Sequence, residues 1–253
     1  MLGFMPASVP AGSSLTQDVY ERLRADVLAC RLLPGTRLRI GELCAQLGVS
    51  LSAVREALAR LTSEELVVAE PQRGFRVAPI SSAELADVTQ VRIRIECACL
   101  DLAVARGDLA WETALVAALH RLSRTPEWEA GGAPRMNEVW SAAHAEFHSV
   151  LASGCGSPWL LRLRRILYDQ SERYRRLSVP LADSSRDVAG EHKAIADATL
   201  ARDAARATAL LAEHLSLTAR ILQQQPWPAT DSGEQGPPPV KARGRALSSL
   251  PRA

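Results

Sequence analysis

Residues 41–63 have the pattern of two short helices joined by a tight turn, and this pattern restricts the fold more than any other part of the sequence. Apolar side chains at helical spacing mark the first helix, and Gly48 stands where the turn needs a residue that tolerates positive φ. Ser50 can cap a second helix over residues 51–63, whose apolar positions again recur at helical spacing. We therefore expect a helical hairpin in which the turn presents the second helix.

Two short apolar segments follow the hairpin and enclose a basic turn. Val67–Ala69 and Phe75–Val77 flank residues 71–74, which end in Arg73 and Gly74. Such segments around a turn predict a two-stranded β ribbon. Hairpin and ribbon together predict a winged helix-turn-helix, whose second helix enters the major groove of double-stranded DNA. A helical hairpin that serves only as part of a core is the alternative.

The expected DNA contacts come from the first turns of the second helix and from the tip of the ribbon. Ser50, Ser52 and Arg55 would reach base edges or phosphates, and an arginine there can donate two parallel hydrogen bonds to guanine. Arg73, followed by the flexible Gly74, suits a contact with a phosphate or with the minor groove. For Arg55, an exposed side chain paired with a nearby glutamate is the alternative.

The charge balance is that of a protein with a few cationic side chains at defined positions, not of one with a generally basic surface. The 253 residues carry a net charge of +2, and residues 15–78 hold nine arginines against eight Asp and Glu. This favours a dimer on a palindromic site over indiscriminate binding to nucleic acid.

The five cysteines form no C-x-x-C pair, so we expect a chain without disulfides in the cytoplasm. No run approaches 18 apolar residues, so we expect no membrane partners.

Beyond residue 80 the sequence shows helical patterns and no β-period segment. The expected helices span residues 81–106, 109–124, 136–153, 157–178, 184–201 and 203–224. We therefore expect a mainly α fold, with a winged helix-turn-helix over residues 15–78 and an all-helical bundle over residues 79–224. The small and Pro/Gly-containing ends, residues 1–14 and 225–253, are expected to be disordered.

Four of the five histidines have the spacing of metal ligands. His144 and His148 lie one helical turn apart on one face. His192 and His214 lie on the last two helices, which a short connection would pack antiparallel, so the two rings could meet. Imidazole nitrogen suits Zn, Ni or Cu better than hard cations. The spacing predicts a metal site, with capping or exposed histidines as the alternative.

The same histidines have to be considered as part of an enzyme. His144-Ala-Glu-Phe-His148 differs from the zinc-protease motif H-E-x-x-H, because Glu146 lies one position late and points about 100° away on the helix. The sequence contains no G-x-S-x-G, no P-loop and no G-x-G-x-x-G. We expect no catalytic activity, and a metal-dependent enzyme with an appended helix-turn-helix remains the alternative.

The N-terminal part resembles the DNA-binding domain of the GntR family of bacterial transcription regulators. The likeness rests on V-R-E-A-L at residues 54–58 and on Arg73-Gly74 of the ribbon. The sequence departs from the family at Gly41 and Leu51, where members often carry arginine. The resemblance implies binding to a DNA operator, and the two departures leave the operator sequence open.

The helical part resembles the FCD ligand-binding domain of FadR-type members of this family. The likeness is carried by Arg92-x-x-Ile95-Glu96, Phe147-His148, Glu191-His192 and His214-Leu215. In metal-binding members an acid or amide joins three histidines, and His144 stands at the position of that acid here. The resemblance implies a divalent metal held by His144, His148, His192 and His214. A set of four histidines favours Zn, or Ni, over Mn.

The resemblance also implies a small carboxylate effector. Arg92 matches the arginine that typically faces a carboxylate in the family's pocket, although a simple pair with Glu96 is the alternative. Arg173 and Tyr174 belong to a stretch similar to carbon-starvation-induced, glutarate-responsive repressors. One carboxylate of such an acid would take the metal and the other an arginine. We expect a homodimeric repressor of carboxylate catabolism genes, with a DNA-binding dimer that has no effector as the alternative.

Overall fold

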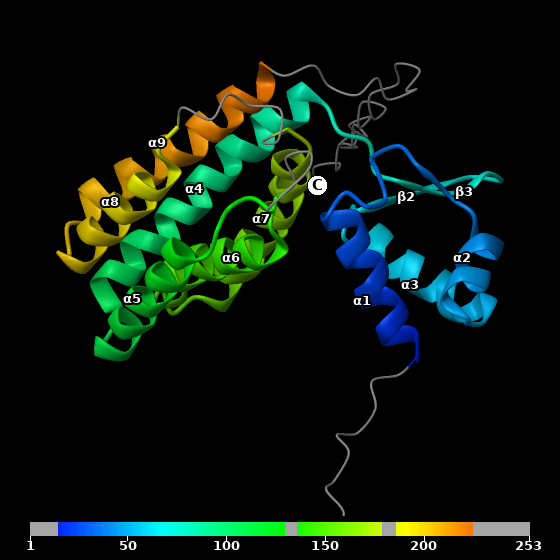
Figure 1. Ribbon diagram of the computed structural model, residues 1–253, viewed down its shortest axis with the longest axis horizontal. Coiled ribbons are helices and arrows are strands. Elements are labelled where there is room, and N and C mark those ends of the chain that lie inside the picture. The colour runs from blue at the N-terminus through cyan, green and yellow to red at the C-terminus, as the bar shows by residue number, and fades with distance from the viewer. Residues whose placement is uncertain (1–14, 130–135, 179–185, 225–253) are drawn as a thin grey trace, which may run out of the picture.

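The computed structural model describes residues 15–129, 136–178 and 186–224. The two ends expected to be disordered lie outside these residues. Figure 1 shows two units side by side, a helical bundle and a smaller domain with the β strands, and α1 of the smaller domain lies between its other elements and the bundle. No helix in the described ranges combines the length and the apolar character that crossing a membrane requires.

The smaller domain is a winged helix-turn-helix, as the sequence predicts. Its elements are α1 (Leu15–Leu28), β1 (Arg37–Leu38), α2 (Ile40–Leu47), α3 (Leu51–Ser63), β2 (Val67–Glu70) and β3 (Gly74–Val77). Helix α2 ends at Gly48, which adopts a φ of +66°. Ser50 caps α3 by accepting the N–H of Ala53 at 3.4 Å. The turn therefore uses the two residues that the sequence offers for it.

The sheet of this domain has three strands, whereas the sequence predicts a ribbon of two. Strand β3 lies in the middle and pairs antiparallel with β2 on one side and with β1 on the other. In the β1 pair, Arg37 lies opposite Arg76. Because β1 is only two residues long, it has no room for the alternation that identifies a strand in a sequence.

The core of the winged domain determines which face of α3 remains free. Four apolar side chains of α3 are fully buried against α1, α2 and the sheet, namely Val54, Ala57, Leu58 and Leu61. Ser52 and Arg55 lie on the opposite, exposed side. The same helical period therefore buries one face of α3 and leaves the other open to a partner.

The bundle consists of α4 (Ser82–Arg106), α5 (Leu109–Arg124), α6 (Glu138–Ser153), α7 (Pro158–Ser178), α8 (Val188–Leu200) and α9 (Ala204–Gln223). Helix α4 packs against α6, α7 and α9 and passes through the bundle (Figure 1). Helix α8 begins four residues later than expected, because Asp187 caps it by accepting the N–H of Gly190 at 2.8 Å. The core includes Leu100, Leu115, Phe147, Ile195 and Leu211.

Helix α7 connects the bundle to the winged domain. Asp169 forms an ion pair with Arg24 of α1. The side-chain amide of Gln170 donates to the carbonyl of Glu64 at the end of α3 at 3.0 Å. Arg173 donates to the carbonyl of Ala78 in the link between the two units. The C-terminal half of α7 thus holds α1, the end of α3 and the link.

Candidate functional site

The first turns of α3 present the residues that the sequence assigns to DNA. Ser50 and Ser52 are exposed, and their hydroxyl oxygens lie 3.0 Å apart. Arg55 is exposed one turn further on and forms no ion pair with any described residue. Its guanidinium is therefore available to a DNA base or a phosphate. The alternative, in which Arg55 pairs with a nearby glutamate, does not describe this structure.

The tip of the ribbon is basic and its backbone is held in place. Gly74 adopts a φ of +93°, which only glycine reaches without strain. Arg73 is exposed, and its carbonyl accepts hydrogen bonds from Arg37 at 2.7 and 3.2 Å. Sequence reasoning missed this role of Arg37, because the pairing of β1 that brings the two residues together has no sequence signal.

The bundle brings His144, His148, His192 and His214 together. One ligand atom from each ring lies within 4.8 Å of the others, and all four side chains are buried. His144 and His148 stand on α6 with ring centroids 4.6 Å apart, and His192 of α8 meets His214 of α9 at 4.7 Å. Two pairs from three helices therefore enclose one point inside the bundle.

These four side chains have the chemistry of metal ligands. Neither ring nitrogen of His148 has a hydrogen-bond partner in the described structure, nor has Nε2 of His192. Burial, with the other histidines and nearby arginines, lowers the pKa of His144, His148 and His192 well below the usual range. The rings are therefore neutral at pH 7 and have lone pairs for a cation. Nitrogens bound tetrahedrally to one zinc ion lie about 3.4 Å apart, so the most widely separated rings would approach by about 1.4 Å to share one ion.

A carboxylate orients the fourth histidine. Nδ1 of His214 lies 2.7 Å from the Glu191 carboxylate, to which it donates, and this leaves Nε2 as the ligand atom. Arg186 donates to both oxygens of Glu191 at 2.7 and 2.5 Å. Burial alone would raise the pKa of Glu191, but the hydrogen bonds from Arg186 and His214 outweigh it and lower the pKa to about 2. The carboxylate therefore stays ionised and fixes the ring.

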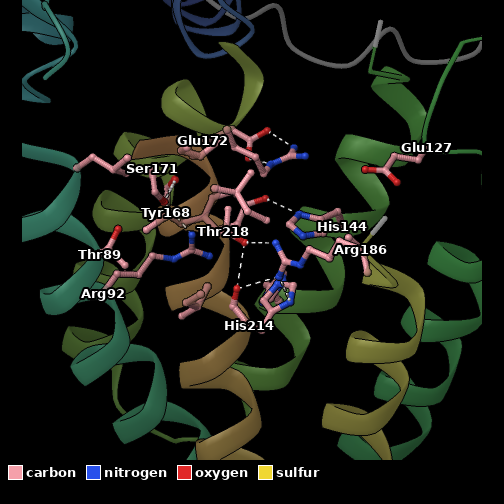
Figure 2. A pocket seen from close by; sticks show the side chains of 18 of the residues that line it. Thr89, Arg92, Glu127, His144, Tyr168, Ser171, Glu172, Arg186, His214 and Thr218 are labelled. Carbon is pink, nitrogen blue, oxygen red and sulfur yellow. Dashed lines mark hydrogen bonds and ion pairs between the residues drawn. The ribbon is translucent and has the colours of Figure 1, made fainter. Parts of the chain in front are cut away.

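A cavity of about 140 Å³ lies beside the histidines. Figure 2 shows Arg92 and Arg186 entering it from opposite sides, with His144 and His214 along its wall. Further lining residues include Leu85, Thr89, Trp140, Tyr168, Ser171, Glu172, Arg175 and Thr218. Sequence reasoning missed Tyr168, Glu172 and Arg186, because their inward positions depend on how α7 and the start of α8 pack.

Arg92 is the cation of this cavity with unused hydrogen-bonding capacity. Its Nε donates to Glu96 at 3.0 Å and its Nη1 to Ser171 at 2.8 Å, whereas its buried Nη2 has no partner among the described residues. Glu96 is also bound by Arg164, at 2.9 Å. The pair with Glu96 therefore exists, but it holds Arg92 in place and leaves one donor for a guest.

Arg173 and Tyr174 lie away from the cavity, although the sequence suggested that they bind the effector. Arg173 is buried against the link between the domains, where it donates to Ala78. The hydroxyl of Tyr174 donates to Glu84 at 2.5 Å and accepts the N–H of Ser81 at 3.3 Å. Both point to the winged domain and the start of α4, because α7 turns this face towards them.

Glu146, the acid closest to the zinc-protease motif in the sequence, does not reach the histidines. Glu146 is exposed on the outer side of α6 and pairs with Arg121 of α5. What the fold and the site define is a DNA-binding protein with an exposed recognition helix and a separate helical domain, in which buried histidines lie beside a cavity.

Comparison with known families gives this class a name. Residues 15–77 match the family described as "Bacterial regulatory proteins, gntR family", and residues 87–217 match the FCD domain. The chain belongs to the GntR family of bacterial transcription regulators and carries an FCD domain.

Two relatives match most of the chain. The transcriptional regulator BphR of Paraburkholderia xenovorans is 39% identical over 87% of this chain and 89% of its own length. The transcriptional repressor GlaR of Escherichia coli is 35% identical over 82% of this chain and 95% of its own length. These families and relatives are all transcription regulators, which confirms the prediction that the chain is not an enzyme.

Solved structures share the fold. E. coli McbR/YncC superposes with a TM-score of 0.70 at 24% identity, over 84% of this chain and 99% of that one. A putative GntR regulator from Rhodococcus sp. RHA1 gives a TM-score of 0.67 at 26% identity, over 85% of this chain and 100% of that one. The mainly α fold predicted from the sequence is confirmed.

Proposed function

We propose that this protein is a homodimeric, metal-containing repressor that binds a palindromic operator in the cytoplasm and responds to a small dicarboxylate. One observation carries the proposal. The cavity is lined by Arg92, whose buried Nη2 has no hydrogen-bond partner among the described residues, and by three of the four buried histidines, His144, His148 and His214. A cation and a free guanidinium donor facing one small cavity suit an anion with two charged ends.

The metal of this proposal is zinc, with nickel as the other candidate. His144, His148, His192 and His214 offer four neutral nitrogen ligands and no oxygen ligand, which favours a borderline cation over Mg or Mn. When bound, the metal would supply a local positive charge that attracts a carboxylate oxygen. The histidines hold it, and Glu191 fixes the tautomer of His214.

The effector of this proposal is glutarate or a related dicarboxylate. The sequence of residues 140–176 resembles that of carbon-starvation-induced, glutarate-responsive repressors, and this resemblance is what suggests glutarate here. A cavity of about 140 Å³ suits a short acid. The wall opposite the histidines carries Arg92, which would receive the second carboxylate. Repression, rather than activation, is supported by the relative named as a repressor.

The test is fluorescence anisotropy of the purified protein on labelled DNA from upstream of its own gene, titrated with succinate, glutarate and adipate. We expect tight binding of this DNA, and release when glutarate is added. Arg55→Ala is the control for the DNA face, because this exposed side chain lies far from the cavity. It should lose DNA binding and keep its affinity for the acid.

Metal analysis of untagged protein tests the other half of the proposal. One tightly bound metal per chain is expected in the wild type and less than a tenth of that in a His148→Ala/His192→Ala variant. A wild type free of metal, or DNA binding that no acid changes, would favour a DNA-binding dimer without an effector.

A further inference from the structure

The recognition helix α3 begins with a large apolar side chain that faces solvent. Leu51 is 52% exposed and stands at the first position of the helix, between Ser50 and Ser52. Among the described residues it belongs neither to the buried core of the winged domain nor to the partly buried side chains packed against that core. Packing within the winged domain therefore does not explain a leucine at this position.

The helical period places Leu51 on the side of α3 that is open to DNA. Arg55 and Ala59 follow it at four-residue intervals, and both are exposed as well. Side chains four residues apart on a helix are neighbours on one face. Val54, by contrast, is fully buried on the core side. A DNA duplex that meets Arg55 therefore meets Leu51 as well.

The chemistry of a leucine limits what it can contact in the major groove. Its side chain has no donor and no acceptor, so it cannot bind phosphate oxygens or the hydrogen-bonding groups of base edges. The apolar group that base pairs present in the major groove is the 5-methyl group of thymine. The first residues of a recognition helix are the ones that reach base edges there. An exposed leucine at the start of α3 therefore suits a thymine.

The neighbours of Leu51 fix its position relative to Arg55. Ser50 accepts the N–H of Ala53 at 3.4 Å, and its hydroxyl oxygen lies 3.0 Å from that of Ser52, so the cap holds the first turn of the helix. Four residues of helix rise about 6 Å, and base pairs stack about 3.4 Å apart. Leu51 and Arg55 therefore reach points within about two base pairs of each other.

We propose that Leu51 reads the 5-methyl group of a thymine in each half of the operator, within about two base pairs of the position that Arg55 contacts. The inference rests on the proposed function only in requiring an operator with two halves. Its own basis is the exposure of Leu51 and its place on α3. It adds one element of the operator sequence to that function, namely a required thymine.

The experiment uses the full chain and begins with the selection of binding sites from a pool of random duplexes, so that it does not depend on an assumed operator. We expect the wild type to select a thymine in each half-site. Leu51→Ala should select the same site without that thymine. Leu109→Ala is the matched control, because Leu109 is 76% exposed at the first position of α5, outside the winged domain. Circular dichroism checks that each variant is folded.

Removal of the methyl group then tests the contact directly. Deoxyuridine replaces each thymine of the selected duplex in turn, which deletes only the 5-methyl group. At the required thymine, anisotropy should show about a fourfold loss of wild-type affinity for one half-site and about a 15-fold loss for both, the effect of one buried methyl group each. Leu51→Ala should bind the two duplexes equally. Leu51→Met, which keeps an apolar side chain of similar volume, should keep the dependence.

Two results would overturn this inference and leave the proposed function intact. One is a selected site at which no deoxyuridine replacement weakens binding. The other is a loss as large in Leu51→Ala as in the wild type, which would assign the effect to the shape of the DNA. A wild type that selects no sequence at all would contradict the proposed function together with the thymine contact.

Discussion

At the scale of single residues, the arrangement around Glu96 is the basis of the anion site that we propose inside the apolar bundle. Its carboxylate is 2% exposed and lies between Arg92 and Arg164. One buried negative charge therefore faces two positive ones, so the wall keeps an excess positive charge. Since Nη2 of Arg92 has no partner in the described structure, a carboxylate that enters the cavity both neutralises that excess and satisfies a buried donor.

Arg92→Lys should therefore weaken effector binding while leaving the fold intact. Lysine keeps the charge but cannot hold Glu96 and Ser171 and still offer a second donor. Glu96 remains compensated by Arg164. We expect a 10- to 100-fold loss of glutarate affinity by calorimetry, as for one hydrogen bond to a charged group, about 1.5–3 kcal/mol. Arg220→Lys, a change in an exposed surface pair, should bind as the wild type does. Equal affinities for both variants would remove Arg92 from the site.

Cys30 should make stability depend on alkaline pH. Its thiol donates to the carbonyl of Arg173 at 3.4 Å, and burial raises its pKa from the ordinary value of 9.0 to about 11. The unfolded chain therefore loses this proton near pH 9, whereas the folded chain keeps it to about 11. The contribution to stability is complete below pH 9 and is lost as pH rises from 9 to 11. In urea unfolding, Cys30→Ser should show a flatter decline across this window than the wild type, and parallel curves would contradict the assignment.

At the scale of elements, helix α7 explains how the cavity and the DNA-binding domain can communicate. Tyr168, Ser171 and Arg175 turn towards the cavity. Asp169 and Gln170, on the other side of the same helical turns, hold α1 and the end of α3. Because one rigid helix carries both sets, a guest that moves α7 also moves its contacts with the winged domain.

Removal of these contacts should uncouple the two domains. In an Asp169→Ala/Gln170→Ala variant, glutarate affinity measured without DNA should stay within twofold of the wild type, since neither side chain lines the cavity. The effect of glutarate on DNA affinity should fall at least fivefold. Lys193→Ala/Asp197→Ala, which removes an exposed pair on α8, is the matched control. An unchanged response in the first variant would exclude α7 as the connection.

Two glycines should respond to substitution in opposite directions. A Cβ on Gly107, which ends α4, would lie 2.1 Å from the ring of Trp111, whereas one on Gly41 in α2 would meet nothing within 4 Å. Gly107→Ala should therefore lower the free energy of unfolding by about 1–3 kcal/mol, and Gly41→Ala should raise it by up to about 1 kcal/mol. Urea titration measures both. A stabilised Gly107→Ala would contradict the close approach of the Trp111 ring to the end of α4.

The elements also show what the sequence could and could not reveal. Helical period alone placed His144 and His148 on one face, because that relation is local. Arg173 and Tyr174 could not be placed in the same way, since the side of α7 that meets the cavity depends on its packing against α1. Strand β1 exists only through its pairing with β3. Local geometry was therefore predictable, whereas the pairing of β1 with β3 and the contacts of α7 with the link between the domains were not.

At the scale of the whole molecule, the small net charge requires that DNA affinity come from a few arginines that stand at the DNA-facing surface. The chain carries a net charge of +2, so long-range attraction is weak. The exposed and unpaired cations of the winged domain include Arg55 on α3 and Arg73 on the ribbon. In a dimer each is present twice. The affinity should therefore depend on salt in proportion to a small number of phosphate contacts.

Arg73→Ala tests this view of the molecule. Each phosphate contact contributes about 0.9 to the slope of the logarithm of affinity against the logarithm of salt concentration, so a dimer that loses two contacts should lose about 1.8. The measurement is anisotropy on the upstream DNA at several KCl concentrations, with Arg220→Ala as the control on α9. If Arg73 instead enters the minor groove to read bases, affinity for the operator should fall more than affinity for random DNA. An unchanged slope and an unchanged preference would together remove the wing from the DNA contact and leave recognition to α3.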